Sequence, residues 1–130
     1  MNRVLFLIIA IVLASFTQVF AQKETSLIGR WKVKMEGTDE DSVIEFRNNG
    51  KVNGYIVEYT DESGNKQEAF EKAVTDITFN GEKGKCRYSF EWEDESYEVD
   101  AKLMMKKSGI IEVSYRYEGY TLKETWTKIK

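Results

Sequence analysis

The sequence contains no histidine, no proline and a single cysteine, Cys86. Histidine is the commonest general base and metal ligand in proteins, so its absence removes Ser-His-Asp and Cys-His catalytic groups from this chain. A single cysteine cannot form a disulfide within the chain. The acidic clusters at residues 39–41 and 91–95 lack the spacing of an EF-hand loop and are typical of solvated turns. We therefore expect no metal site, no cofactor and no enzymatic activity.

The charge is nearly balanced, which argues against a nucleic-acid partner. The chain has 19 lysine and arginine residues against 22 aspartate and glutamate residues, a formal charge of −3. Nucleic-acid-binding domains usually carry a strongly basic patch. Here charges of both signs alternate with apolar residues, as expected for the solvated face of a sheet. We therefore expect no binding to nucleic acid.

Long apolar runs are also scarce, and the one present lies at the amino terminus. Residues 1–21 read MNRVLFLIIAIVLASFTQVFA, in which Arg3 precedes the apolar run and Ala21 ends a small-x-small cleavage pattern. The run is shorter than the about 20 apolar residues of a transmembrane helix. We therefore expect a cleaved signal peptide rather than a membrane anchor, and no transmembrane span after cleavage. The next residue is Gln22 rather than cysteine, so a bacterial lipid anchor is not indicated, and residues 22–130 form a single predicted domain.

Beyond this segment, apolar and polar residues alternate with a period of two. The pattern is clearest at residues 85–92 and in the segment 96–129, where short polar or glycine-containing breaks separate three runs. Such alternation is typical of antiparallel strands with one buried face. Residues 67–72 fit either one helical turn or a short strand, and the facing of residues 52–59 is ambiguous. The predicted strands cover residues 27–36, 42–47, 52–59, 73–79, 85–92, 97–105, 111–117 and 120–126.

About eight strands with short sequential connections restrict the fold class. Strands in such an order usually pair with their neighbours in sequence. The mature chain offers no helix long enough to cover an open sheet face, and closure of the sheet removes both exposed edges. We therefore predict an all-β fold, an antiparallel up-and-down (meander) barrel of about eight strands. The interior of such a barrel is either filled by side chains or holds one small ligand.

Aromatic side chains are concentrated on the predicted inward faces. They can fill the core, since aromatic residues dominate core burial in small domains. Alternatively, they can form the wall of a ligand pocket in which tyrosine hydroxyls orient the ligand. Tyr115 and Tyr117 are the stronger pocket candidates, because a buried tyrosine needs a partner for its hydroxyl. The candidate ligand-binding residues are Trp31, Tyr88, Trp92, Tyr97, Tyr115, Tyr117, Glu124 and Trp126.

Glu124 is the unusual member of this set. It shares its face with Leu122 and Trp126, so strict alternation places its carboxylate inside the barrel, where an unpaired charge is costly. Three arrangements would relieve the cost: a basic partner inside the barrel, a position at a wet barrel mouth, or a bulge that turns the side chain outward. Inside a pocket, the carboxylate could bind a cationic ligand or act with a tyrosine as an acid or base.

Alternation also assigns the facing of other residues. Thr75, Ile77 and Phe79 share one predicted inward face. Cys86 lies on the same face as Tyr88, so we expect it to be buried, and no basic motif beside it would activate its thiol.

The short motifs of the mature chain resemble a known family. Gly29-Arg30-Trp31 resembles the G-x-W motif at the start of lipocalin and calycin barrels, and the segments 54–57 (GYIV) and 125–129 (TWTKI) resemble those of the lipocalin-like DUF2147 group of small secreted bacterial proteins. The resemblance implies a calycin-like barrel in the cell envelope and no established activity. It also implies that Trp31 packs across the barrel floor against a basic residue near the last strand. Lys128 and Lys130 are the candidates here, in place of the family's arginine.

Together these observations favour a secreted or periplasmic lipocalin-like barrel that binds a small hydrophobic or amphipathic ligand. The alternative is a structural or interaction module of the cell envelope with a filled barrel, whose outer surface binds an envelope protein partner or another copy of itself. Val43, Met104 and Ile110 occupy predicted outward positions and are candidates for such a surface. A cavity lined by the tyrosine and tryptophan side chains would favour binding, whereas a solid core with an exposed apolar patch would favour the interaction module.

Overall fold

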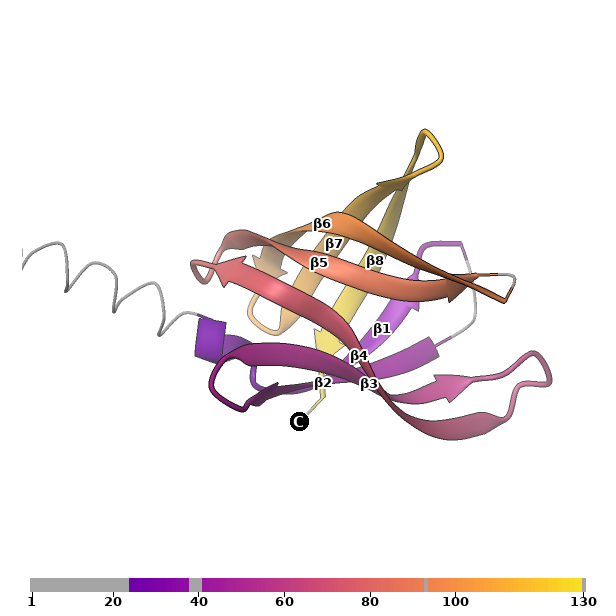
Figure 1. The fold of residues 1–130 in the computed structure, drawn as a ribbon. Helices are drawn as coiled ribbons and strands as arrows, with labels where there is room; N and C mark the ends of the chain where they lie inside the picture. Colours follow the sequence, from indigo (N-terminus) through magenta and orange to yellow (C-terminus); the bar gives the residue numbers. More distant parts are fainter. Residues whose placement is uncertain (1–23, 38–40, 93, 130) are drawn as a thin grey trace, which may run out of the picture.

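The computed structural model describes residues 24–37, 41–92 and 94–129, without the side chain of Trp92. The predicted signal peptide, residues 1–21, lies outside this part. No helix in these ranges is long and apolar enough to cross a membrane. The described elements are the short 3-10 helix η1 (Thr25–Leu27) and the strands β1 (Gly29–Met35), β2 (Asp41–Asn48), β3 (Val52–Thr60), β4 (Lys66–Phe79), β5 (Lys83–Trp92), β6 (Glu95–Lys107), β7 (Ile110–Tyr117) and β8 (Tyr120–Lys128), as shown in Figure 1.

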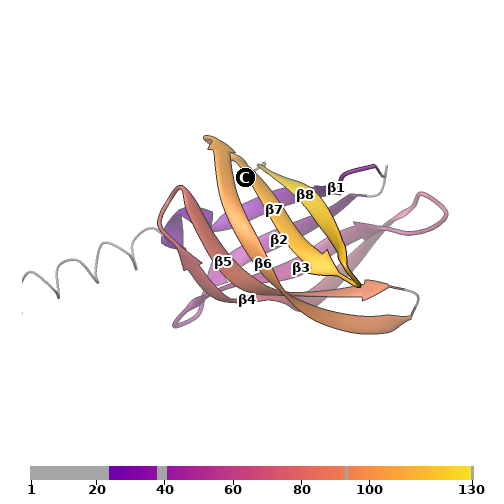
Figure 2. The same cartoon turned by 90° about the horizontal axis from the view of Figure 1, so that it is seen from above.

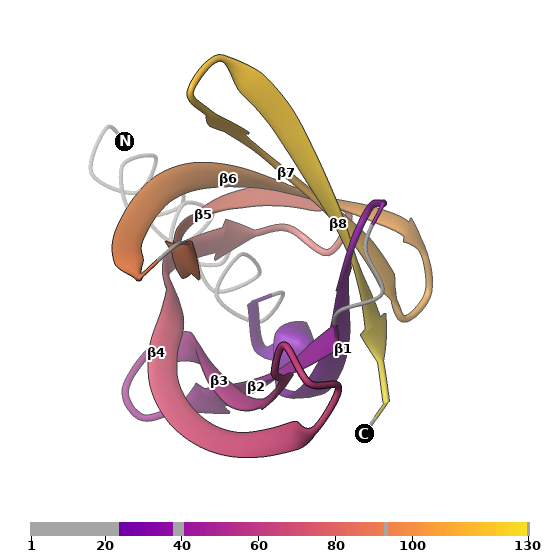
Figure 3. The same ribbon diagram turned by 90° about the vertical axis from the view of Figure 1, so that its right-hand side faces the viewer.

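The eight strands form a closed antiparallel barrel. Each strand pairs with the next in sequence, and β8 returns to pair with β1, so the predicted all-β up-and-down barrel is confirmed. Figure 3 looks along the barrel, and the strands follow one another around a ring with η1 behind it. The closing register pairs Trp31 with Lys128 and Met35 with Glu124. These two pairs are the outermost pairs of the β1–β8 ladder.

Strand β4 begins earlier than the predicted strand 73–79 and includes residues 67–72, which are therefore strand rather than a helical turn. Its first part pairs with the end of β3 in a long hairpin. At the turn, the Asp61 carboxylate accepts hydrogen bonds from the backbone N–H groups of Ser63 and Asn65, an arrangement that stabilises turns. Figures 1 and 2 show that this hairpin extends past the end of β1.

A bulge in β4 changes which side chains face the core. Asp76 has a positive φ of 51°, and the β4–β5 register shifts between Thr75 and Thr78. A bulge inserts an extra residue and reverses the facing of the residues before it relative to those after it. Val74 is therefore fully buried, and the prediction that Thr75 shares the inward face with Ile77 and Phe79 is wrong, because it did not include this bulge.

The pairing of β3 resolves its ambiguous facing. Ile56 pairs with the buried Ile44, so Ile56 faces the interior. Gly54 also faces inward, and a Cβ at this position would lie 2.9 Å from a ring carbon of Phe46, so the position has no room for a larger side chain. Tyr55 lies on the outside, where its ring stacks on that of Phe70 with centroids 4.8 Å apart.

The three predicted outward apolar residues differ in their exposure. Met104 is 49% exposed and Ile110 is half-buried. Val43 is 8% exposed, so this candidate does not contribute to an exposed apolar surface. Its pairing with Lys32 gives it the outward orientation that alternation predicts, but neighbouring parts of the structure cover it. Position on the outer face of a strand therefore does not determine exposure.

One end of the interior is packed solid. Trp31, Trp126, Phe46 and Leu27 are fully buried at the end where η1 lies. The Trp31 Nε1–H donates a hydrogen bond of 2.8 Å to the Leu27 carbonyl. The ammonium of Lys128 lies 5.6 Å from the Trp31 ring centroid and donates a hydrogen bond of 3.2 Å to the Ser26 carbonyl. The expected packing of Trp31 against a basic residue of the last strand is therefore present, whereas Lys130 lies outside the described residues.

We predict that Trp31→Ala lowers the free energy of unfolding by about 3–5 kcal/mol, because it empties the packed end of the barrel and removes an indole hydrogen bond. The matched control is Met104→Ala on the outer face, which should change stability by about 0.5 kcal/mol or less. Urea unfolding followed by circular dichroism measures both values. Equal losses in the two variants would show that the Trp31 end does not hold the barrel together.

Candidate functional site

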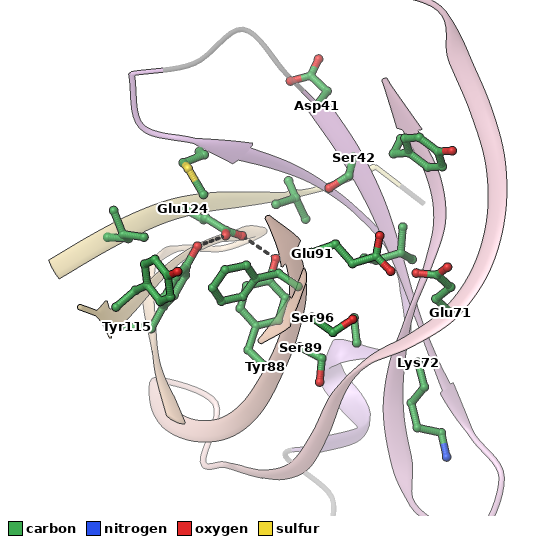
Figure 4. Close-up of a pocket in the computed structure, with 18 of the residues that line it drawn as sticks. Asp41, Ser42, Glu71, Lys72, Tyr88, Ser89, Glu91, Ser96, Tyr115 and Glu124 are labelled. Atoms are coloured by element: carbon green, nitrogen blue, oxygen red, sulfur yellow. Dashed lines mark hydrogen bonds between the residues drawn. The ribbon is translucent and has the colours of Figure 1, made fainter. Parts of the chain in front are cut away.

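The end of the barrel opposite Trp31 is hollow. A cavity of about 800 Å³ lies between the ends of the strands, with lining residues from all eight of them. Val33 and Met35 of β1, Ile56 of β3, Ala73 of β4 and Leu122 of β8 form much of its apolar wall. Figure 4 shows this cavity with Tyr88, Tyr115 and Glu124 grouped on one side. The barrel is therefore filled at one end and open at the other.

Glu124 lies at the boundary between the cavity and the packed end. It is 4% exposed, yet it is also one of the residues that line the cavity. Its Oε1 accepts hydrogen bonds from the Tyr88 hydroxyl at 2.9 Å and from the Trp126 Nε1–H at 3.0 Å. Its Oε2 accepts a hydrogen bond from the Tyr115 hydroxyl at 2.6 Å. The carboxylate is thus held by three uncharged donors.

This arrangement differs from the three that alternation suggested for Glu124. The carboxylate points inward, so no bulge turns it outward, and it is too buried for a solvated mouth position. Among the described residues, no ion pair includes Glu124. Hydrogen bonds to hydroxyl and indole donors offset part of the cost of burying the group. Uncharged hydrogen-bond donors, rather than a basic residue, therefore offset the desolvation cost of burying the Glu124 carboxylate.

The two tyrosines that bind Glu124 are held in their protonated form. Burial raises the pKa of Tyr88 well above its usual value, and the negative charge of Glu124 adds to the effect. Burial and Glu124 raise the pKa of Tyr115 in the same way. Both hydroxyls therefore remain hydrogen-bond donors throughout the neutral pH range.

An aromatic cluster continues from Tyr88 towards the mouth. The ring centroids of Phe90 lie 5.5 Å from Tyr115 and 5.9 Å from Tyr117, distances typical of favourable aromatic pairs. Tyr97 joins the cluster through Tyr117, at 4.8 Å, but does not line the cavity. The hydroxyl of Tyr97 donates to Glu95 at 2.8 Å, and hydrogen bonding with Tyr117 and Glu95 raises its pKa.

The predicted candidate residues thus separate into groups. Trp31 and Trp126 belong to the packed end, and the side chain of Trp92 lies outside the described residues. Tyr97 supports the aromatic cluster from outside the cavity. Those that line the cavity are Tyr88, Tyr115, Tyr117 and Glu124.

The cavity also has lining residues that the sequence did not single out. These residues all face inward from the part of a strand that lies nearer the mouth. This location cannot be recognised from the sequence before the strands are paired. These residues are Val33, Met35, Ile56, Ala73, Phe90 and Leu122.

The rim of the cavity is acidic. Its charged residues are four carboxylates against one lysine, namely Asp41, Glu71, Glu91, Glu118 and Lys72. One oxygen of Asp41 lies 3.3 Å from the Lys32 ammonium, whereas its Oδ1 is buried and has no hydrogen-bond partner in the part of the chain that the structure describes. Asp41 and Glu91, which belong to the two acidic clusters, therefore border the cavity.

Cys86 is buried, as expected, on the inner side of β5. Burial, with smaller contributions from Asp100 and Glu124, raises the pKa of its thiol to about 12. The thiol is therefore not a nucleophile at neutral pH. Within residues 24–37, 41–92 and 94–129, no group of three or more histidine, cysteine, aspartate or glutamate residues is placed to hold a metal ion.

Comparisons with protein-family models, with curated proteins and with solved structures find no match to this chain.

We predict that Tyr115→Phe lowers the free energy of unfolding by about 1–3 kcal/mol, because it leaves a buried carboxylate oxygen without its donor. Tyr97→Phe is the matched control, since it removes the same hydroxyl from an exposed bond to Glu95, and should cost less than about 1 kcal/mol. Urea unfolding of the two variants tests this difference. If both variants lose the same stability, the Glu124 network contributes nothing beyond an exposed contact.

The raised tyrosine pKa values predict a loss of stability in alkaline solution. Above about pH 10 the tyrosines of the unfolded chain ionise, while Tyr88 and Tyr115 stay protonated in the folded barrel. The unfolded state then binds fewer protons than the folded state, so the free energy of unfolding falls as the pH rises, and the contribution is fully present below pH 10.

Urea unfolding at pH 9, 10 and 11 measures the fall, and Tyr115→Phe should show a shallower decline than the unsubstituted protein. Comparison with this variant cancels the titration of lysine and of the other tyrosines. Parallel declines in the two proteins would contradict the assigned role of Tyr115.

Proposed function

We propose that this protein is a non-enzymatic, lipocalin-like barrel that binds one small, amphipathic and largely apolar molecule. The observation that carries the proposal is the cavity of about 800 Å³ at one end of the barrel. Its size lies within the range of small-molecule sites, which are commonly about 300–1,000 Å³. Apolar and aromatic side chains form its wall, and a few polar groups converge at Glu124. Sites for amphipathic molecules usually combine these features.

The packing of the barrel supports binding over the filled-barrel alternative. A structural module needs side chains throughout its interior, whereas here a cavity occupies the end opposite Trp31 and Trp126. The outer face carries Phe70, which is 60% exposed and stacks on Tyr55, with the Arg47 guanidinium 4.9 Å from its ring centroid. An isolated exposed aromatic residue is common on protein surfaces. It does not by itself favour a protein partner.

The proposed location is outside the cytoplasm, in the periplasm or the secreted fraction. The sequence of residues 1–21 supports this proposal through its basic start, apolar run and small-x-small end. The contact between Trp31 and Lys128 supports the lipocalin-like assignment, since the resemblance implies a tryptophan and a basic residue at the barrel floor.

The test uses the neutral dye N-phenyl-1-naphthylamine, whose fluorescence rises in apolar sites, together with native mass spectrometry of the purified mature protein. We expect the dye to bind and Leu122→Trp to weaken binding by about tenfold or more, because the indole occupies the cavity. Met104→Trp adds the same indole on the outer face and should leave binding unchanged.

Organic extraction of the protein after native mass spectrometry identifies any molecule that it carries. Unchanged dye binding by Leu122→Trp would show that the cavity is not the binding site. Absence of both dye uptake and an extractable molecule would refute the proposed function.

A further inference from the structure

The cavity contains a negative charge that no described basic residue balances. Glu124 is almost completely buried, and its partners Tyr88, Tyr115 and Trp126 are all uncharged. Hydrogen bonds reduce the cost of a buried carboxylate but do not neutralise it. A cation brought into the cavity would therefore gain the attraction of a charge that is weakly screened by water.

The geometry at Glu124 leaves an acceptor position for such a cation. Oε1 accepts two hydrogen bonds, from Tyr88 and Trp126, whereas Oε2 accepts one, from Tyr115. Each carboxylate oxygen can accept about two hydrogen bonds. Because Glu124 also lines the cavity, the remaining position on Oε2 can receive an N–H donor from a bound molecule.

The charges around the mouth favour a cation as well. Glu71, Glu91 and Glu118 line the cavity together with a single lysine, Lys72, and Asp41 lines it while paired with Lys32. Figure 4 shows the Lys72 side chain extending away from Glu124. A rim with this excess of negative charge attracts cations and repels anions, because like charges brought together in a poorly solvated site are costly.

The aromatic residues beside Glu124 suit the same ligand. The rings of Tyr88 and Tyr115 lie with centroids 5.5 Å apart, next to Phe90 and Tyr117 on the cavity wall. Faces of aromatic rings attract ammonium groups, most strongly where water is excluded. Next to these rings, Leu122 pairs with Tyr115 across β7 and β8, and Val33 pairs with Trp126 across β1 and β8, so both offer surface for an apolar body beside the aromatic cluster.

We propose that the ligand is an amphipathic organic cation, a protonated primary amine whose ammonium group donates a hydrogen bond to Glu124 Oε2. Its apolar body lies along Val33, Ile56 and Leu122. This inference rests on the proposed function, and it narrows the ligand class by rejecting fatty-acid-like anions, which would place a second carboxylate beside Glu124.

The experiment compares three probes of equal length and different charge: octylamine, 1-octanol and octanoate. Isothermal titration calorimetry at pH 7 with the mature protein measures their affinities. We expect octylamine to bind about tenfold or more tightly than 1-octanol, because a charge-assisted hydrogen bond is added, and octanoate to bind most weakly. This series on the unsubstituted protein decides the charge preference without any variant.

Glu124→Gln tests the position of the ammonium group. The amide keeps the shape of the side chain and an acceptor for Tyr88 and Trp126, but it removes the charge. We expect this variant to lose the charge preference, so that octylamine binds it no more tightly than 1-octanol does. Glu98→Gln is the matched control, since it removes the same charge from an exposed pair with Arg87 on the outer face, and it should leave all three affinities unchanged.

The outcomes separate this inference from the proposed function. Equal affinities for the three probes would refute the proposal that the ligand is a cation, and so would tight octylamine binding by Glu124→Gln. Neither result would refute the proposal that the barrel binds a small molecule. Binding of N-phenyl-1-naphthylamine without any binding of octylamine would have the same meaning. Failure of the dye and of all three probes would overturn both proposals.

Discussion

The pairing of β8 with β1 is the constraint on which both ends of this barrel depend. Its register places Lys128 beside Trp31 at one end and Glu124 beside Met35 at the other. The first pair belongs to a floor closed by η1 and an indole, and the second lies where the interior opens. A shift of one residue would reverse the facing of every β8 side chain. It would move Glu124 and Trp126 to the outer surface and abolish floor and cavity together.

The sequence predicted the architecture well, because alternation and turn residues are local signals. The predicted strands 85–92 and 111–117 lie within one or two residues of β5 and β7. Strict alternation gives Glu124 the inward side that the structure shows, although the sequence left its facing open between inward and outward arrangements. Local signals failed where the backbone departs from regular alternation. The bulge at Asp76 reversed the expected facing of Thr75, and neither residue type nor spacing marked it in advance.

The partners of Glu124 could not be predicted in the same way. Tyr88 lies 36 residues before it and Tyr115 lies nine residues before it, so their meeting depends on the pairing of several strands. Whether the interior is hollow depends on the summed volumes of side chains from all eight strands, which no single segment specifies. The sequence therefore predicted candidate pocket residues, but it could not show which of them line the cavity. The structure shows that Tyr115 lines the cavity and that Trp126 is packed in the closed end.

The division of the interior along the barrel axis also makes the protein suitable for redesign. The closed end contains the fully buried Trp31, Trp126 and Phe46, whereas side chains such as Ile56 and Leu122 border the cavity. Substitutions near the mouth therefore disturb few tightly packed neighbours. Substitutions around the cavity can change which molecule binds, while the closed end keeps its sequence and holds the fold. Natural or laboratory evolution can therefore vary ligand selectivity without rebuilding the whole barrel.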